Sequence, residues 1–143
     1  MPNAIVILNY NGVQHLQTYL PSVLEYSPNW EVVVADNAST DDSRSFIESN
    51  FPQIKVIQLE QNYGFAGGYN HALGQLKDHY EHYFILNSDV RLTANWDVPL
   101  LEYLAKNPAA AVVGPKVLAD RAPLQFEHAG AAGGYLDTFY FPF

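Results

Sequence analysis

The feature that most constrains the fold is a regular alternation of short apolar runs with segments of helical spacing. The runs Ala4–Leu8, Glu31–Ala35 and Tyr83–Leu86 are continuous and rich in β-branched or aromatic residues, which is typical of strands buried on both faces. A segment with apolar residues three or four positions apart follows the first run, over Val13–Tyr26. The same order of strand and helix occurs four times. It predicts an α/β domain with a mostly parallel sheet and right-handed crossovers.

The remaining elements are expected at positions set by the same patterns and by turn residues. We expect a third strand over 54–59, helices over about 41–50, 66–80 and 96–106, a glycine-rich loop over 62–68, and a fifth strand over 110–113. After Pro115 the periodicity ends.

Composition excludes several classes of protein. The chain has no cysteine, which rules out a disulfide scaffold, a zinc–thiolate site and thiol catalysis. Its 7 Lys and Arg against 15 Asp and Glu give a net charge of −8, which argues against nucleic-acid binding. No apolar run approaches the roughly 20 residues that span a bilayer, and no basic region precedes the first run. We therefore expect a cytoplasmic protein with at most peripheral attachment to the inner face of the membrane.

Polar clusters follow three of the first four predicted strands, at Asn9–Asn11, Asp36–Asn37 and Asn87–Asp89. Parallel strands bring such clusters to one edge of the sheet, where open α/β sheets bind their ligands. Turn propensity explains any single cluster. Three clusters on one edge favour a binding site.

The class of ligand follows partly by elimination. A dinucleotide fold needs a G-x-G-x-x-G loop after its first strand, and Asn9–Gly12 stands there instead. Asp36 is placed to bond a ribose or a base edge, and Asp89 is placed to hold a metal. Magnesium often takes only one or two carboxylates and completes its shell with water and phosphates. A nucleoside diphosphate bound through a metal therefore suits this acidic chain.

Four motifs together resemble those of family 2 glycosyltransferases, which have the GT-A fold. They are Val6–Gly12, Val33–Asp41, Asn62–Asn70 and Leu86–Val90. The subgroup most similar to them is the rhamnosyltransferase-like enzymes that build bacterial surface polysaccharides. The resemblance implies a three-layer α/β/α fold that is incomplete at its C-terminal side. Residues 1–118 would form the nucleotide-sugar-binding half, and residues 119–143 would begin a truncated acceptor-side region.

The same resemblance implies a role for each matching position. Tyr10 would stack on the base, and Asp36 would accept a hydrogen bond from the base imide. Asp89 would bind Mg²⁺ or Mn²⁺. The other residues implied in nucleotide-sugar binding are Asn9, Asn11, Asn62, Gly67, Gly68, Asn70, Asn87 and Ser88. Gly67 and Gly68 would let the backbone approach the ribose and diphosphate closely.

The implied reaction is transfer of a sugar, with inversion, to a saccharide or lipid-linked acceptor. It needs a carboxylate as general base. The acids after Asp120 are Glu127 and Asp137, and neither stands in the family's sequence context, so the catalytic base stays unassigned. A non-catalytic nucleotide-sugar-binding module is therefore the alternative. A nucleotidyltransferase is disfavoured, because the basic glycine-rich signature after the first strand is absent.

The histidines and the aromatic C-terminus complete the set of candidates. His15, His71, His79 and His82 are most simply surface or half-buried residues, and a metal-binding role for His128 is disfavoured. Five aromatic residues fall in the last nine positions. Because the missing acceptor half would normally cover this tail, we expect the chain to expose an apolar patch there, to self-associate through it, or to leave the tail poorly ordered.

Overall fold

The computed structural model describes residues 1–127. The chain divides into two compact units, Met1–Leu92 and Thr93–Phe143, and each is described here by itself.

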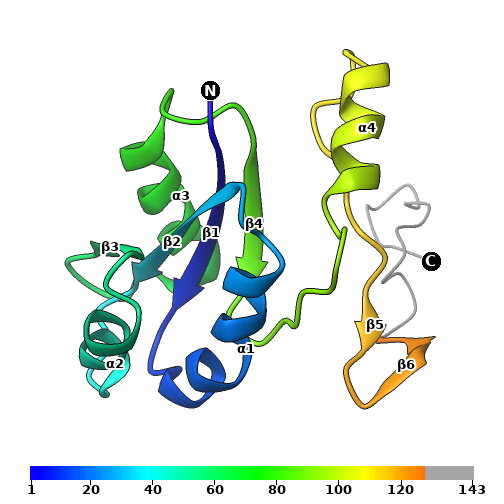
Figure 1. Cartoon of the computed structure of the whole chain (residues 1–143). Helices are drawn as coiled ribbons and strands as arrows, with labels where there is room; N and C mark the ends of the chain where they lie inside the picture. The colour runs from blue at the N-terminus through cyan, green and yellow to red at the C-terminus, as the bar shows by residue number, and fades with distance from the viewer. Residues whose placement is uncertain (128–143) are drawn as a thin grey trace, which may run out of the picture. The chain divides into compact units, whose positions relative to one another are not determined.

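The first unit is built on a four-stranded sheet in which all neighbouring strands are parallel. The strand order is β3-β2-β1-β4 (Figure 1). The strands are β1 (Asn3–Asn9), β2 (Trp30–Asp36), β3 (Lys55–Gln58) and β4 (Tyr83–Asn87), and the helices between them are α1 (Val13–Glu25), α2 (Ser43–Asn50) and α3 (Gly64–Leu76). The α/β fold with a mostly parallel sheet is thus confirmed.

Helices cover both faces of this sheet (Figure 1). On one face, Val6 and Val33 pack in a buried cluster with Ala72 and Leu76 of α3. Their chain neighbours point to the opposite face. There Ile5, Ile7 and Val34 of the sheet and Leu16, Leu20 and Ile47 of α1 and α2 are also buried. Strands buried on both faces explain why the sequence shows continuous apolar runs rather than alternation.

The strand order places a topological switch point between β1 and β4. From β1 the chain moves outward through β2 to β3, and α3 then carries it back across to β4 on the other side of β1. Ligands of open α/β sheets bind beyond the carboxyl ends of the strands at such a point. The fold therefore indicates that a ligand site would lie at the residues that follow Leu8 and Leu86.

One boundary differs from the sequence prediction in a way that concerns the candidate site. Helix α3 begins at Gly64, two residues before the predicted start at 66, so Gly67 and Gly68 lie in its first turns as the predicted helix has them, and the predicted loop over 62–68 is shorter. A Cβ built on Gly68 would lie 2.7 Å from Cδ1 of Leu8. Glycine at this position therefore lets α3 pack closely on β1, which composition alone does not reveal.

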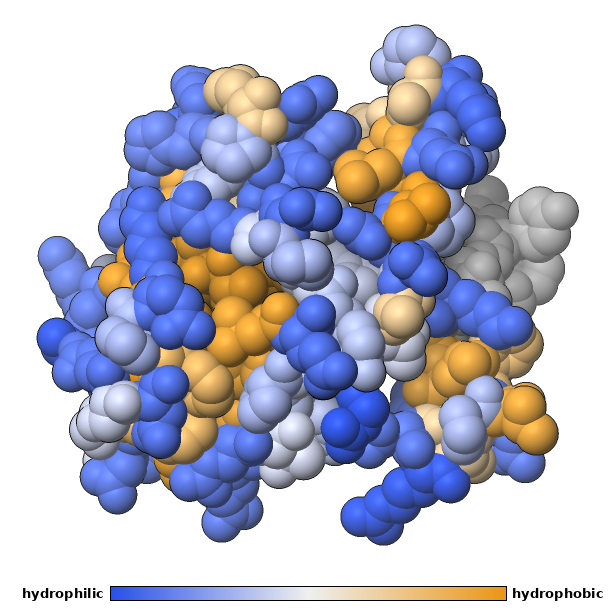
Figure 2. Space-filling model, viewed as in Figure 1, coloured by the Kyte–Doolittle hydropathy of each residue, from blue (hydrophilic) through white to orange (hydrophobic). Residues whose placement is uncertain are grey.

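The second unit contains α4 (Val98–Lys106) and an antiparallel pair of strands, β5 (Leu118–Ala119) and β6 (Ala122–Phe126). The predicted strand over 110–113 is wrong: that segment pairs with no strand among residues 1–127, and Val112 is 86% exposed. None of the residues of α4 is buried. Apolar surface is visible over α4 and over the β5–β6 hairpin in Figure 2.

Candidate functional site

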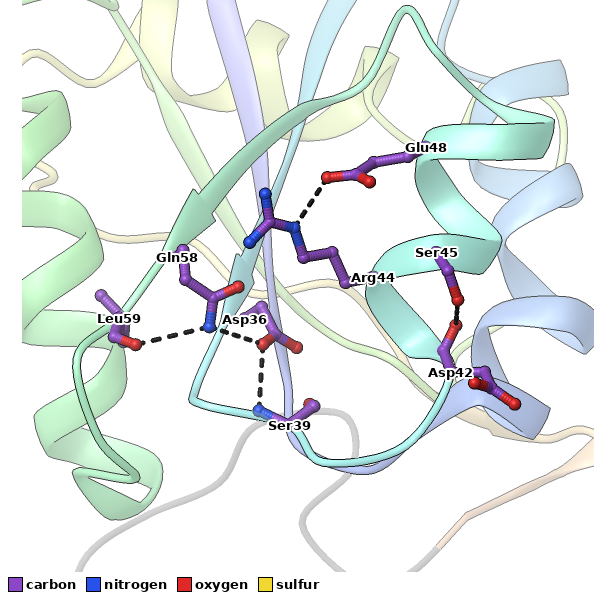
Figure 3. Close-up of polar contacts among 8 residues, drawn as sticks. All are labelled: Asp36, Ser39, Asp42, Arg44, Ser45, Glu48, Gln58 and Leu59. Carbon is purple, nitrogen blue, oxygen red and sulfur yellow. Dashed lines mark hydrogen bonds and ion pairs between the residues drawn. The ribbon is translucent and has the colours of Figure 1, made fainter.

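The ends of β1 and β2 are joined by a buried polar network. Asn9 and Asp36 are register partners, and Asn9 Nδ2 donates hydrogen bonds to Asp36 Oδ1 at 3.0 Å and to Ser39 Oγ at 3.1 Å. Asp36 Oδ2 accepts from the backbone N–H of Ser39 and from Gln58 Nε2, both at 3.0 Å (Figure 3). Asp36 is only 1% exposed. Both of its oxygens are thus engaged by the protein, so its position is set by folding.

The turn after β1 is fastened to the loop after β2 by Asn11. This residue has a left-handed backbone, with φ of 50°. Its Oδ1 accepts hydrogen bonds from the N–H groups of Thr40 at 2.7 Å and Asp41 at 3.3 Å, and its own N–H donates to Ser39 Oγ at 2.9 Å. Tyr10 lies between the two anchored asparagines and is 50% exposed. The turn therefore presents an aromatic ring to solvent on a fixed backbone.

The segment after β3 is fastened to the end of β2 by Asn37, which is 2% exposed. Asn37 Nδ2 donates to Asn62 Oδ1 at 2.9 Å and to the carbonyl oxygen of Gly64 at 3.1 Å. Its Oδ1 accepts from the N–H of Tyr63 at 3.0 Å. The sequence placed Asn37 at a strand end but assigned it no function, and only the fold shows that it positions Asn62.

Asp41 connects the starts of two helices. Its Oδ2 accepts from the N–H of Val13 at 3.1 Å, and its Oδ1 accepts from the N–H of Ser43 at 3.0 Å. Burial acts to raise the pKa of Asp41, but the hydrogen bonds from Ser43 and Val13 outweigh it and hold the pKa below its ordinary value. The carboxylate therefore occupies the N-terminus of α1, which is the place where many α/β folds bind a phosphate.

A hollow of about 240 Å³ lies at the end of β4. Its lining consists of Leu8, His15, Phe65, Asn87, Ser88 and Asp89. A Cβ built on Gly12 would lie 3.7 Å from Ser88 Oγ, so the residues after β4 lie beside the β1–α1 turn. Asn87 and Asp89 are exposed, in contrast to Asn9 and Asp36. The structure thus places two of the three polar clusters in one network and the third around an adjoining hollow.

Helices α1 and α3 supply two side chains to this hollow to which the sequence assigned no function. His15 lies in the first turns of α1, and Phe65, which is 64% exposed, lies at the start of α3. Asn70 is exposed on α3. Phe65 lies inside the motif Asn62–Asn70, and His15 lies three residues after the motif Val6–Gly12. Helical spacing alone does not tell which face of each helix the fold turns toward β4.

The hydroxyl of Tyr69 bridges the two strands at the switch point. It donates to the carbonyl oxygen of Leu86 at 2.8 Å and accepts from the N–H of Leu8 at 3.4 Å. Tyr69 is 4% exposed. Burial raises the pKa of its hydroxyl, and the negative charge of Asp89 adds to this effect. The hydroxyl therefore stays a donor, and it fixes the backbone that leads into Asn87–Asp89.

The donor set fits a metal that arrives together with phosphates. Asp89 offers one exposed carboxylate at the hollow, and residues 1–127 contain no group of three or more His, Cys, Asp or Glu that could hold a metal ion. A metal caged by protein ligands alone does not suit this part of the chain. Mg²⁺ bound through one carboxylate and substrate phosphates does.

Some sequence candidates lie outside the described residues. These are His128, Asp137 and the aromatic residues of the last nine positions. Within the described part of the chain, no helix has the length and apolar character needed to cross a membrane.

Comparison with known proteins gives a family match over nearly the whole chain. The profile of the family described as "Glycosyl transferase family 2" matches residues 4–141. The chain is 30% identical over 142 residues to the putative teichuronic acid biosynthesis glycosyltransferase TuaG of Bacillus subtilis (strain 168), covering 94% of this chain and 56% of TuaG. The chain thus spans little more than half the length of this curated relative.

Solved structures share the fold. TarS of S. aureus in complex with UDP superposes with a TM-score of 0.63 at 25% identity, covering 76% of this chain and 33% of that one. The mannosyltransferase PcManGT of Pyrobaculum calidifontis, in complex with GDP-Man and Mn²⁺, superposes with a TM-score of 0.54 at 25% identity, covering 78% of this chain and 33% of that one.

Proposed function

The chain belongs to glycosyltransferase family 2, and from that premise we propose that it binds a nucleoside-diphosphate sugar at the carboxyl ends of β1, β2 and β4. One observation carries this proposal. The strand-end network of Asn9 and Asp36 adjoins a hollow lined by Asn87, Ser88 and Asp89, at the switch point of a parallel sheet.

The nucleoside would lie on the rigid part of the site. Tyr10 offers an exposed ring for stacking on the base. Asp36 Oδ1, which accepts one hydrogen bond within the protein, would accept a second from the base imide, and Asn9, Asn11 and Asn62 would lie around the base. TarS structures with UDP and with UDP-GlcNAc support a pyrimidine donor. The identity of the base and of the sugar is left to experiment, since the PcManGT structure holds a guanine nucleotide sugar, GDP-Man.

The diphosphate and its metal would lie at the end of β4. Asp89 would hold Mg²⁺ or Mn²⁺, with Asn87 and Ser88 beside the ribose and phosphates. When bound, the metal supplies charge stabilisation for the leaving diphosphate. Gly67, Gly68 and Asn70 on α3 would complete the donor-facing side. Gly68 also has the packing function described above.

The reaction proposed is an inverting transfer. An acceptor hydroxyl oxygen forms a bond to the anomeric carbon, the bond from that carbon to the diphosphate oxygen breaks, and a base takes the hydroxyl proton. Tyr69 and Asn37 act on this reaction only by positioning the strand ends. No residue among 1–127 is assigned as the base.

The proposal for the acceptor and the cellular process depends on similarity to relatives. TuaG is named for teichuronic acid biosynthesis. We propose by analogy that this chain acts in cell-surface polysaccharide synthesis, on a saccharide or lipid-linked acceptor at the inner face of the membrane, and that its rhamnosyltransferase-like motifs indicate the subgroup. Residues 1–118 would carry donor binding, and residues 119–143 would begin the acceptor side.

The test is direct binding of nucleotides to the 143-residue chain. UDP-, dTDP- and GDP-sugars are titrated by calorimetry with and without Mn²⁺, and release of the nucleoside diphosphate is followed with saccharide acceptors. We expect metal-dependent binding of one nucleotide class. Absence of binding to all three would overturn the proposal. Binding without turnover would favour the non-catalytic module, for which the unassigned base is the supporting observation.

A further inference from the structure

We propose that His15 on α1 contacts the diphosphate of the nucleotide through an imidazole N–H. This inference rests on the proposed function, because it concerns the same site. It adds a residue from outside the four motifs.

The usual place for a diphosphate in an α/β fold is already filled. In doubly wound folds the phosphates lie at the N-terminus of the helix after the first strand, where free N–H groups and the helix dipole attract them. Here the carboxylate of Asp41 accepts the hydrogen bond from Val13, the first residue of α1. A diphosphate placed there would meet a negative charge. It therefore needs donors elsewhere.

The hollow at the end of β4 offers one basic side chain. Of its six lining residues, only His15 can carry a positive charge, while Asp89 is acidic and Leu8 and Phe65 are apolar. The imidazole keeps at least one N–H donor whether it is neutral or protonated. A metal at Asp89 and a donor at His15 would thus face the same diphosphate from the turn after β4 and from α1.

The ring of His15 packs on one neighbour on α1. It stacks on Tyr19, with ring centroids 6.4 Å apart and an interplanar angle of 24°. The guanidinium carbon of Arg91 lies 5.3 Å from the centroid of the same tyrosine ring. This packing limits the positions of an otherwise exposed side chain, which lowers the entropy that a ligand contact would cost.

The experiment separates phosphate contacts from nucleoside contacts. UDP, dTDP and GDP, and the three matching nucleosides, are titrated in Mn²⁺ into the full 143-residue chain and its variants. His15→Ala should weaken binding of the diphosphate about tenfold, as expected for a lost hydrogen bond to a charged group. It should leave nucleoside binding unchanged. His15→Gln, which keeps an N–H donor, should recover most of the affinity. His79→Ala, which removes an exposed histidine just after the C-terminal end of α3, should bind like the unmodified chain.

Three outcomes would overturn the inference. Equal diphosphate affinity of His15→Ala and the unmodified chain would remove His15 from the site while leaving the proposed function intact. A loss of Mn²⁺ affinity in the absence of nucleotide, measured by electron paramagnetic resonance, would make His15 a metal ligand instead. Failure of the unmodified chain to bind any of the three diphosphates would overturn the proposed function, and this inference with it.

Discussion

The two halves of the candidate site differ in how completely the protein has satisfied its own polar groups. At the ends of β1 and β2, Asn9 and Asp36 are buried, and both oxygens of Asp36 accept hydrogen bonds from the protein. The exception in this half is Asn9 Oδ1, which has no hydrogen-bond partner among residues 1–127. At the end of β4, Asn87 and Asp89 are exposed around a hollow. The first half is shaped by folding, whereas the second half has polar groups available to a ligand.

This difference matches the chemistry of the proposed donor. A flat base is recognised by shape and a few fixed hydrogen bonds, which favours a rigid wall. A diphosphate with its metal brings its own charge and geometry, so it can complete a site that the protein leaves open. Substitutions in the first half should therefore act mainly on stability, and those in the second half on binding.

The largest effect is expected from Asp36→Ala. The change leaves donors on Asn9, Ser39 and Gln58 without their shared acceptor inside the protein. Asn9 is buried and Ser39 is half-buried, whereas Gln58 is exposed and can bond to water instead. An unpaired buried donor costs about 1–3 kcal/mol, so we expect a loss of about 2 kcal/mol in the free energy of unfolding, measured with urea. Asp42→Ala, at an exposed carboxylate nearby, should change it by less than about 0.5 kcal/mol. Equal losses of unfolding free energy in Asp36→Ala and Asp42→Ala would show that the hydrogen bonds of Asp36 do not stabilise this half of the site.

Asp89→Ala should show the opposite behaviour. Its carboxylate is exposed at the hollow, so we expect the free energy of unfolding to stay within about 0.5 kcal/mol of the unmodified chain. Metal-dependent nucleotide affinity should fall at least about tenfold, because a charged ligand to the metal is lost. Glu81→Ala removes an exposed carboxylate just before β4, at the opposite end of that strand, and serves as the control. Unchanged affinity in Asp89→Ala would count against its assignment as the metal ligand.

A smaller effect is expected where the two halves meet, at Tyr69. Tyr69→Phe removes the hydroxyl that bonds Leu8 and Leu86, and Tyr83→Phe removes a hydroxyl that donates to the carbonyl oxygen of Leu76 at 2.6 Å. Each variant should lose about 1 kcal/mol of stability. Only Tyr69→Phe should also weaken nucleotide binding, by a few fold, since Tyr83 lies at the start of β4 and Tyr69 contacts its end. An equal effect of both variants on affinity would make the role of Tyr69 merely structural.

The sheet could be predicted from the sequence because strands such as Ala4–Leu8 are buried on both faces and therefore consist of continuous apolar residues. The prediction of a strand around Val112 was wrong, because this segment is apolar but not buried. The segment 110–113 has the residues of a strand, but a strand also needs a neighbour, and no local pattern reports one. Gly68 falls where the predicted loop over 62–68 and the predicted helix over 66–80 overlap, because glycine is typical of turns. In the structure, glycine is needed at this position because α3 packs closely on Leu8.

The same limit applies to the site. Asp36 and Asp89 could be placed from the sequence because each stands at or just after the end of a strand, and parallel strands end at the same edge of the sheet. Asn37 and Asp41 could not be assigned functions, because their long-range hydrogen bonds join segments 25 to 28 residues apart. His15 could not be assigned one, because its position at the hollow depends on which face of α1 the fold turns toward β4. Long-range pairing of that kind is a property of the packed structure and leaves no periodic signal in the chain.

The smallest effect is expected at Asp41, which connects the starts of α1 and α2, and it appears only at acidic pH. Hydrogen bonds hold the folded-state pKa of Asp41 below its ordinary value, so the carboxylate stabilises the fold at pH above the unfolded-state pKa of about 4. This contribution is lost as the pH falls through the lower, folded-state pKa. Asp41→Asn should therefore reduce the steepness with which the free energy of unfolding decreases below about pH 4. Asp42→Asn is the matched control, since the Asp42 side chain makes no cap hydrogen bond to α2. If the two variants alter the acid dependence equally, the loss of a negative charge explains it and the bonds from Val13 and Ser43 do not.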